Sequence, residues 1–178
     1  MGISGLTGWR VLDREEVARL AAHLAALPAP LTAYAAEEAV RQLGWPVVAG
    51  PSFGGAVLRT GLAPYDGFAD LRFTESGATA VVVRVTDPAR EPAAPATSFR
   101  RDAFALAVAV VRELLGPPDE RQPGGSPLVS WSVPAGRLRL TDDGAFVELT
   151  LLSPDYPTGH LTDPESDDFD DVAPGADR

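Results

Sequence analysis

The sequence predicts an α+β fold in which an antiparallel sheet carries a long central helix on one face. Three observations lead to this prediction. Residues 98–115 repeat apolar side chains at the spacing of an α-helix. Six shorter segments alternate apolar and polar residues with the period of a β-strand. Tight turns join consecutive strands, which is typical of antiparallel sheets, so the expected order is two helices, three strands, one helix and three strands.

Two helices are predicted before the first strand, over residues 13–27 and 32–43. The first begins with the spacing of a capping box, in which Asp13 and Glu16 each accept a hydrogen bond from the other's backbone. The second ends at Gly44, a residue type that favours the position just after a helix. We expect the two helices to form an N-terminal hairpin.

The period of the apolar pattern then changes from 3.6 to 2. Strands are predicted over residues 56–62, 69–73 and 81–85 before the long helix, and over residues 128–133, 137–141 and 146–152 after it. The segment 87–97 contains three prolines and is predicted to be a loop. On the long helix, Leu106 and Val110 belong to the apolar stripe, and we expect both side chains to be fully buried.

The length of 178 residues predicts one domain, residues 1–152, followed by a flexible acidic tail, residues 153–178. The tail carries a net charge of −7 and the whole chain −10, which disfavours a nucleic-acid partner. Cysteine is absent, which excludes disulfides, thiolate metal sites and cysteine nucleophiles. We find neither a membrane-spanning apolar run nor the features of a signal peptide, so we expect a cytoplasmic protein without membrane contacts.

One motif suggests catalysis. Residues 50–54 match the G-x-S-x-G pattern of a nucleophile elbow, with Ser52 as the nucleophile. An elbow needs a helix after the serine, whereas a strand is predicted there. Neither His23 nor His160 has a second His or a Cys at the spacing of metal ligands. We therefore expect no enzyme activity, no metal and no cofactor, and a hydrolase that uses Ser52 is the third-ranked hypothesis.

Arginine residues interrupt the apolar alternation in four predicted strands. Because neighbouring side chains on a strand point to opposite faces, these residues are expected to share the sheet face opposite the helix with two acids and three hydroxyl residues. The residues are Arg59, Arg72, Arg84, Arg139, Asp70, Glu148, Ser130, Ser132 and Thr150. Such a face is either a solvated surface with cross-strand pairs or a recognition surface, since arginine binds carboxylates through two hydrogen bonds. The arginines and the two acids are the candidate binding residues.

The tail has two interpretations as well. Phe169 is flanked on both sides by aspartates within an acidic run. The composition is typical of a disordered segment that keeps a protein in solution. Alternatively, Phe169 is the aromatic anchor of a docking segment that grips a basic partner.

Several structural motifs carry a resemblance. They are Leu43-Gly44-Trp45, Gly116-Pro117-Pro118, Trp131 and the closing strand with Val147, Leu149 and Leu151. On these motifs, over about residues 35–152, the chain resembles a family of small actinobacterial proteins of unknown function. Proteins of this kind are similar in organisation to immunity proteins of bacterial toxin systems and to a secretion-chaperone-like fold with the order αβββαββ. The resemblance implies binding rather than catalysis and transfers no catalytic residue.

The first functional hypothesis is therefore a non-catalytic immunity protein that binds and neutralises a cognate toxin. Many such toxins are basic, and an acidic inhibitor gains association rate by electrostatic steering. The alternative hypothesis is a secretion or assembly chaperone. Either protein would act as a monomer or a homodimer on a protein partner, such as a basic toxin domain.

Overall fold

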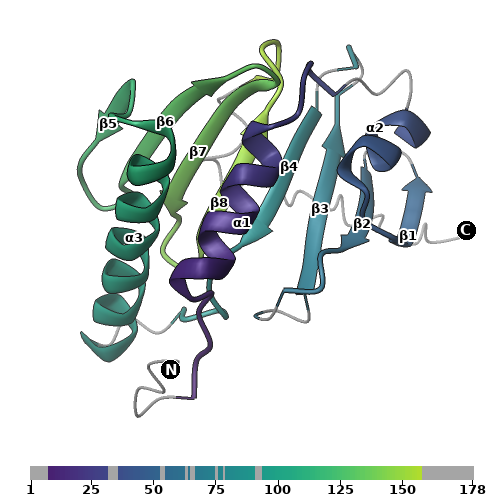
Figure 1. Ribbon diagram of the computed structural model, residues 1–178. Helices are drawn as coiled ribbons and strands as arrows, with labels where there is room; N and C mark the ends of the chain where they lie inside the picture. Colours follow the sequence, from purple (N-terminus) through teal and green to yellow (C-terminus); the bar gives the residue numbers. More distant parts are fainter. Residues whose placement is uncertain are drawn as a thin grey trace, which may run out of the picture.

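The computed structural model describes residues 8–31, 36–52, 55–62, 64, 67–74, 76–77, 79–90 and 94–157. One open sheet of eight antiparallel strands forms the centre of the molecule, and the helices lie on one of its faces (Figure 1). The predicted α+β class, with a long helix packed on the sheet, is confirmed. Phe169 lies outside the described residues, so the structure does not test its role.

The sheet consists of two meanders that meet in the middle. The strands are β1 (Val47–Ser52), β2 (Gly55–Arg59), β3 (Phe68–Phe73), β4 (Thr79–Arg84), β5 (Glu120–Gln122), β6 (Leu128–Val133), β7 (Gly136–Asp142) and β8 (Val147–Leu152). Their spatial order is β1-β2-β3-β4-β8-β7-β6-β5. The last strand of each meander therefore pairs with the last strand of the other, with Val82 opposite Thr150.

Six of these strands were predicted, and the two missing ones are the edge strands. β1 contains Gly50 and Pro51, and its register against β2 shifts twice, so it has no regular alternation. β5 is three polar, exposed residues long. Neither segment has the apolar pattern from which a strand is predicted, because an edge strand needs only one paired neighbour and has little core to cover.

The helices are α1 (Arg14–Ala25), α2 (Ala36–Leu43) and α3 (Ala94–Leu115). The capping box of α1 is present: the backbone of Glu16 donates to Asp13 Oδ1, and the backbone of Asp13 donates to Glu16 Oε2, each at 2.9 Å. α1 packs along α3, while α2 lies over the part of the sheet that holds β2 and β3 (Figure 1). His23 Nε2 lies 2.8 Å from the carbonyl oxygen of Leu43 and so joins α1 to the end of α2.

The hydrophobic core fills the space between the helices and the sheet. α1 contributes Val17, Leu20 and Leu24, and the strands contribute mainly leucine and valine from alternate positions. α3 buries Val110 as predicted, but the prediction for Leu106 is wrong because this side chain is only partly buried.

The buried face of α3 differs from the predicted apolar stripe, since it includes the charged residue Arg100. Its buried members are Ala96, Arg100, Ala103, Ala107, Val110 and Val111. Arg100 Nε donates to Asp142 Oδ1 at 3.0 Å, and its Nη1 donates to the carbonyl oxygen of Ala89. This contact ties the first half of α3 to the end of β7. The helix also starts at Ala94, inside the segment predicted as a loop, because a proline within the first helical turn gives up no hydrogen bond.

Candidate functional site

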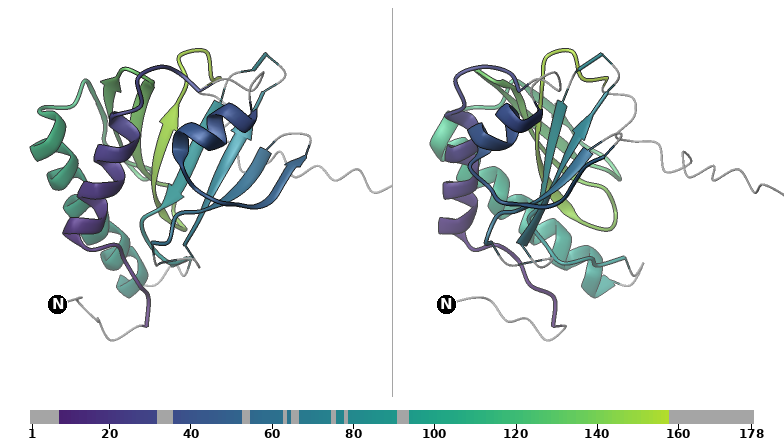
Figure 2. Two further views of the ribbon diagram at one scale, coloured as in Figure 1. Left: turned by 45° about the vertical axis from the view of Figure 1, so that its right-hand side comes forward. Right: turned by 90° about the vertical axis from the view of Figure 1, so that its right-hand side faces the viewer.

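The candidate site is the sheet face opposite the helices, called here the open face. Figure 2 shows the sheet nearly edge-on, with α1 and α2 to one side of it. The register places all six candidate residues of the strands on this face, since their neighbours in sequence, such as Leu71, Val83 and Leu149, belong to the core. The prediction that these charged residues share one face is therefore confirmed, and their binding role stays a prediction.

Three of them form a chain of ion pairs across neighbouring strands, called here the central triad. Arg84 on β4 lies between Asp70 on β3 and Glu148 on β8, with its Nη1 3.2 Å from Asp70 Oδ2 and its Nε 3.6 Å from Glu148 Oε1. The Arg84 guanidinium also sits over the ring of Phe146, 4.8 Å from its centroid. The side chains of Arg84 and Glu148 are only 14% and 16% exposed, so water screens this pair weakly.

Glu148 has an unusual proton affinity for a surface carboxylate. Burial, with the negative charges of Asp143 and Asp70, raises the pKa of Glu148 from 4.5 to about 7 against the opposing effects of Arg84 and Arg72. The ion pair with Arg84 favours the charged form, but the loss of water around the carboxylate outweighs it. Glu148 is consequently a group whose charge changes near neutral pH, a property that is common at functional sites.

A second set of polar residues crosses the other half of the open face. Ser130 on β6, Arg139 on β7 and Thr150 on β8 are directly opposite one another in register and form what we call the polar row. All three are buried, and Arg139 is only 8% exposed. Arg139 makes no hydrogen bond or ion pair with any residue of the described part of the chain, and its Nε is a buried donor without an acceptor. The centre of the polar row is therefore an unusual arginine, because this residue type is rarely buried unless it is paired.

Glu120, the acid whose charge acts on Arg139, forms its hydrogen bonds with other residues. Glu120 on β5 accepts hydrogen bonds from Arg137 at 3.1 Å and from the hydroxyl of Ser130 at 3.3 Å. Burial lowers the pKa of the Arg139 guanidinium, the charge of Glu120 opposes this change, and the charge of Arg137 adds to it. The carboxylate of Glu120 therefore acts on Arg139 through space without a hydrogen bond.

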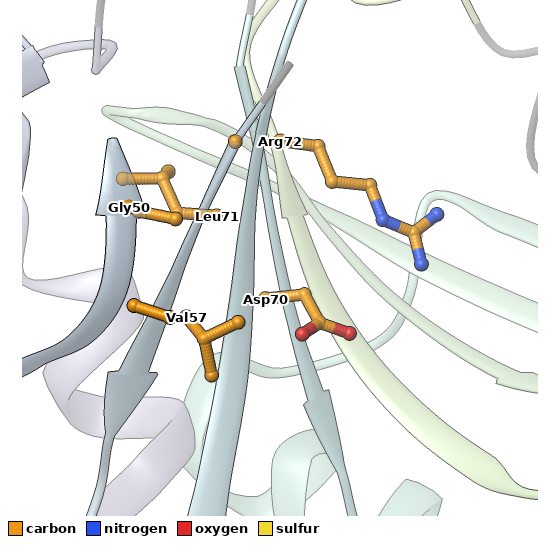
Figure 3. Close-up of a pocket in the computed structure, with 8 residues that line it drawn as sticks. Gly50, Val57, Asp70, Leu71 and Arg72 are labelled. Carbon is orange, nitrogen blue, oxygen red and sulfur yellow. The ribbon is translucent and has the colours of Figure 1, made fainter. Parts of the chain in front are cut away.

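The remaining arginines lie toward the β1 edge. Arg72 has no hydrogen bond or ion pair with the residues that the structure describes, and it lines a depression of about 300 Å³ together with residues of β1, β2 and β3. Figure 3 shows the side chains of Arg72 and Asp70 extending to the same side of the strand. Arg59 is exposed, and its guanidinium lies 5.3 Å from the centroid of the Phe68 ring.

The surroundings of Ser52 differ from those of a nucleophile elbow. Ser52 is the last residue of β1, and it pairs with Gly55, the first residue of β2. The chain therefore passes from strand to strand at this point, whereas an elbow passes from strand to helix. Within the described residues, no group of three or more His, Asp or Glu is placed to hold a metal ion. No helix in the described segments is long and apolar enough to cross a membrane.

The sequence indicates which residues share the open face, but it does not indicate their burial or their hydrogen-bond partners. The burial of Arg139 and the missing acceptor for its Nε are properties of the tertiary structure that alternation along a strand does not indicate. The buried pair of Arg100 and Asp142 was missed because it joins a helix to a strand. The sequence gives one indication of this pair, which is an arginine, Arg100, within the most apolar predicted helix.

The comparisons with known proteins give one match. A model described as a family of unknown function (DUF6301) matches residues 15–153. Neither the curated proteins nor the solved structures contain a match to the chain.

Proposed function

The chain belongs to DUF6301, a family of unknown function, and from its open face we propose that it is a non-catalytic protein that binds another protein. The observation that carries this proposal is that the open face holds two arginines, Arg72 and Arg139, for which the described residues supply no acceptor. Arginines that find no carboxylate among the residues that the structure describes are suited to a carboxylate of a partner, and arginine is enriched at protein interfaces.

We further propose that the partner is a toxin and that the protein is its immunity protein. The net charge of −10 supports a basic partner, because opposite charges accelerate association and suppress binding to wrong partners. The open face supports it as well, since charged groups of both signs alternate over neighbouring strands and allow specific pairing. An immunity protein needs such a face and no catalytic group of its own.

A secretion or assembly chaperone is the second candidate. Val47 and Val48 are large apolar side chains on the edge strand β1, and they are 43% and 44% exposed. An exposed apolar edge is a surface to which an extended segment of another protein can add. The two functions differ in outcome: an immunity protein abolishes the activity of its partner, whereas a chaperone keeps the partner competent for export or assembly.

The proposed function is tested by identifying the partner and then weakening the open face. Mass spectrometry of a pull-down from the native strain identifies the partner, and surface plasmon resonance at two salt concentrations measures the rates. We expect Arg72→Ala to accelerate dissociation more than threefold, because interface contacts act mainly on the dissociation rate. Arg101→Ala, an exposed arginine on α3, is the matched control and should leave both rates unchanged.

Deleting residues 158–178 should instead slow association and reduce its dependence on salt, because it removes acidic charge that attracts a basic partner. One-to-one addition of the protein to its partner should abolish the partner's toxic activity. A partner that binds equally well to wild type and to Arg72→Ala would contradict the proposed interface. A partner that stays active in the complex would favour the chaperone.

A further inference from the structure

Arg139 is the least satisfied charged group on the open face. A guanidinium has five N–H donors and no acceptor, so its environment must supply oxygen atoms. The described residues supply none, although the residue is only 8% exposed. Burying a cation without partners is unfavourable, and such a group is retained in a protein where something else completes it.

The acids around Arg139 are engaged elsewhere. Glu120 accepts hydrogen bonds from Arg137 and Ser130, and Glu148 lies beside Arg84 in the central triad. What surrounds Arg139 directly are the hydroxyl residues Ser130 and Thr150, which face it in register from both neighbouring strands. A hydroxyl group can rotate, so Thr150 can donate beside the Arg139 guanidinium, and Ser130 can do so by giving up its long, 3.3 Å hydrogen bond to Glu120.

We infer that the polar row is a carboxylate-binding site, in which Arg139 receives an Asp or Glu side chain of the partner protein between Ser130 and Thr150. This inference rests on the proposed function and names the chemistry that the open face recognises. A planar guanidinium matches a planar carboxylate through two parallel hydrogen bonds. A carboxylate is favoured over a phosphate because the charge of Glu120 acts on this site, and a negative charge repels a dianion more strongly than a monoanion.

The site can be tested without the partner. Side-chain Nε–Hε resonances of the full-length, ¹⁵N-labelled protein are followed by NMR at pH 8 during titration with acetyl-glutamate amide or with acetyl-glutamine amide, its neutral isostere. We expect the Arg139 resonance and the backbone amides of Ser130 and Thr150 to shift to saturation with the carboxylate. The neutral probe should bind at least tenfold more weakly. Inorganic phosphate should also bind more weakly than the carboxylate, and equal or tighter binding of phosphate would overturn the choice of ligand.

Variants separate the site from the rest of the molecule. Arg139→Gln should abolish the shifts of Ser130 and Thr150, while Arg101→Gln, at an exposed arginine of α3 on the other side of the sheet, should leave them unchanged. Arg139→Lys keeps the charge but loses the planar fork, so it should weaken the binding at least tenfold. The wild-type comparison of the two probes stands even where a variant fails to fold.

Two results would overturn the inference. Equal shifts with both probes would show that no carboxylate is recognised. A shift of the Arg139 resonance on deletion of residues 158–178 would show that the chain's own acidic tail occupies the site. Neither result bears on whether a partner is captured in the pull-down, so the failure of this inference and that of the proposed function can be told apart.

Discussion

Replacing Glu148 with glutamine should change how the stability of the protein depends on pH. Burial, assisted by the charge of Asp143, raises the pKa of Glu148 from 4.5 to about 7 in the folded chain. Between these two values the folded chain holds a proton that the unfolded chain has lost. The contribution of Glu148 to the free energy of unfolding therefore falls as the pH rises from 4.5 to 7, and this contribution changes no further above that range.

The magnitude follows from the size of the pKa change. At about 1.4 kcal/mol for each tenfold change in proton affinity, a rise from 4.5 to about 7 corresponds to about 3 kcal/mol. Glu148→Gln removes this titration because glutamine stays neutral. The stability of the variant relative to wild type should therefore increase by about 3 kcal/mol between pH 4.5 and pH 8.

Urea denaturation of both proteins at half-unit pH intervals measures this difference, and the titration of groups that both proteins share cancels from it. Asp143→Asn is an informative second variant, because it removes a charge that raises the pKa of Glu148 but keeps the Oδ1 acceptor for the backbone of Phe146. We expect it to shift the change in stability to lower pH. A stability difference between Glu148→Gln and wild type that is constant within about 0.5 kcal/mol, or that grows toward low pH, would refute the reasoning.

Three further predictions concern the fold. Asp142→Ala leaves the buried Arg100 without its carboxylate and should cost about 3–5 kcal/mol in chemical denaturation; a loss below about 1 kcal/mol would contradict the importance of this pair. Gly136→Ala should lower the free energy of unfolding by about 3 kcal/mol or more, because φ is +140° and a Cβ would lie 2.0 Å from a carbonyl oxygen of β8. Gly125 has open space around it, so Gly125→Ala should leave the free energy of unfolding unchanged in the same assay. Truncation after Pro157 should change the thermal midpoint by less than about 2 °C in calorimetry, and a larger fall would show that the tail packs on the domain.

The choice of Pro157 as the end of the truncated chain reflects a contact beyond the last strand. Ser153, which the sequence assigned to the tail, is buried, and its hydroxyl accepts a hydrogen bond from the backbone of Thr79 at 2.9 Å. The backbone of Ser153 in turn donates to the carbonyl oxygen of Thr79. Cutting directly after Leu152 would remove both bonds and would mix the effect of the tail with that of the sheet.

The elements that could be predicted are those whose own side chains carry the pattern. β6 was predicted to the residue, because alternation along Leu128–Val133 is independent of the rest of the molecule. β1 and β5 could not be predicted, since each is defined by pairing with a neighbour rather than by its composition. The buried face of α3 was predicted from its large apolar residues. The observed buried face also includes Arg100, whose contact with Asp142 of β7 is seen only in the tertiary structure.

The candidate site divides in the same way. Alternation predicted that Arg84, Glu148 and Arg139 share a face, because the side-chain period of a strand is local. The pairing of Arg84 with Glu148 depends on the register between β4 and β8, which are distant in sequence. Alternation also does not predict exposure: Arg139 was expected on an open surface, and it is only 8% exposed.

The pairing of β4 with β8 has a thermodynamic consequence. Each meander forms from strands that are neighbours in sequence, whereas Val82 and Thr150 are far apart in sequence, so their pairing must close a long loop. Because Arg84 meets Glu148 across this seam, the complete open face exists only in the fully joined molecule. Any ligand that spans both halves adds its binding free energy to the joined state alone. If the open face binds a partner as proposed, binding and the stability of the fold are linked, and the unbound chain would open and be degraded more readily than the bound one.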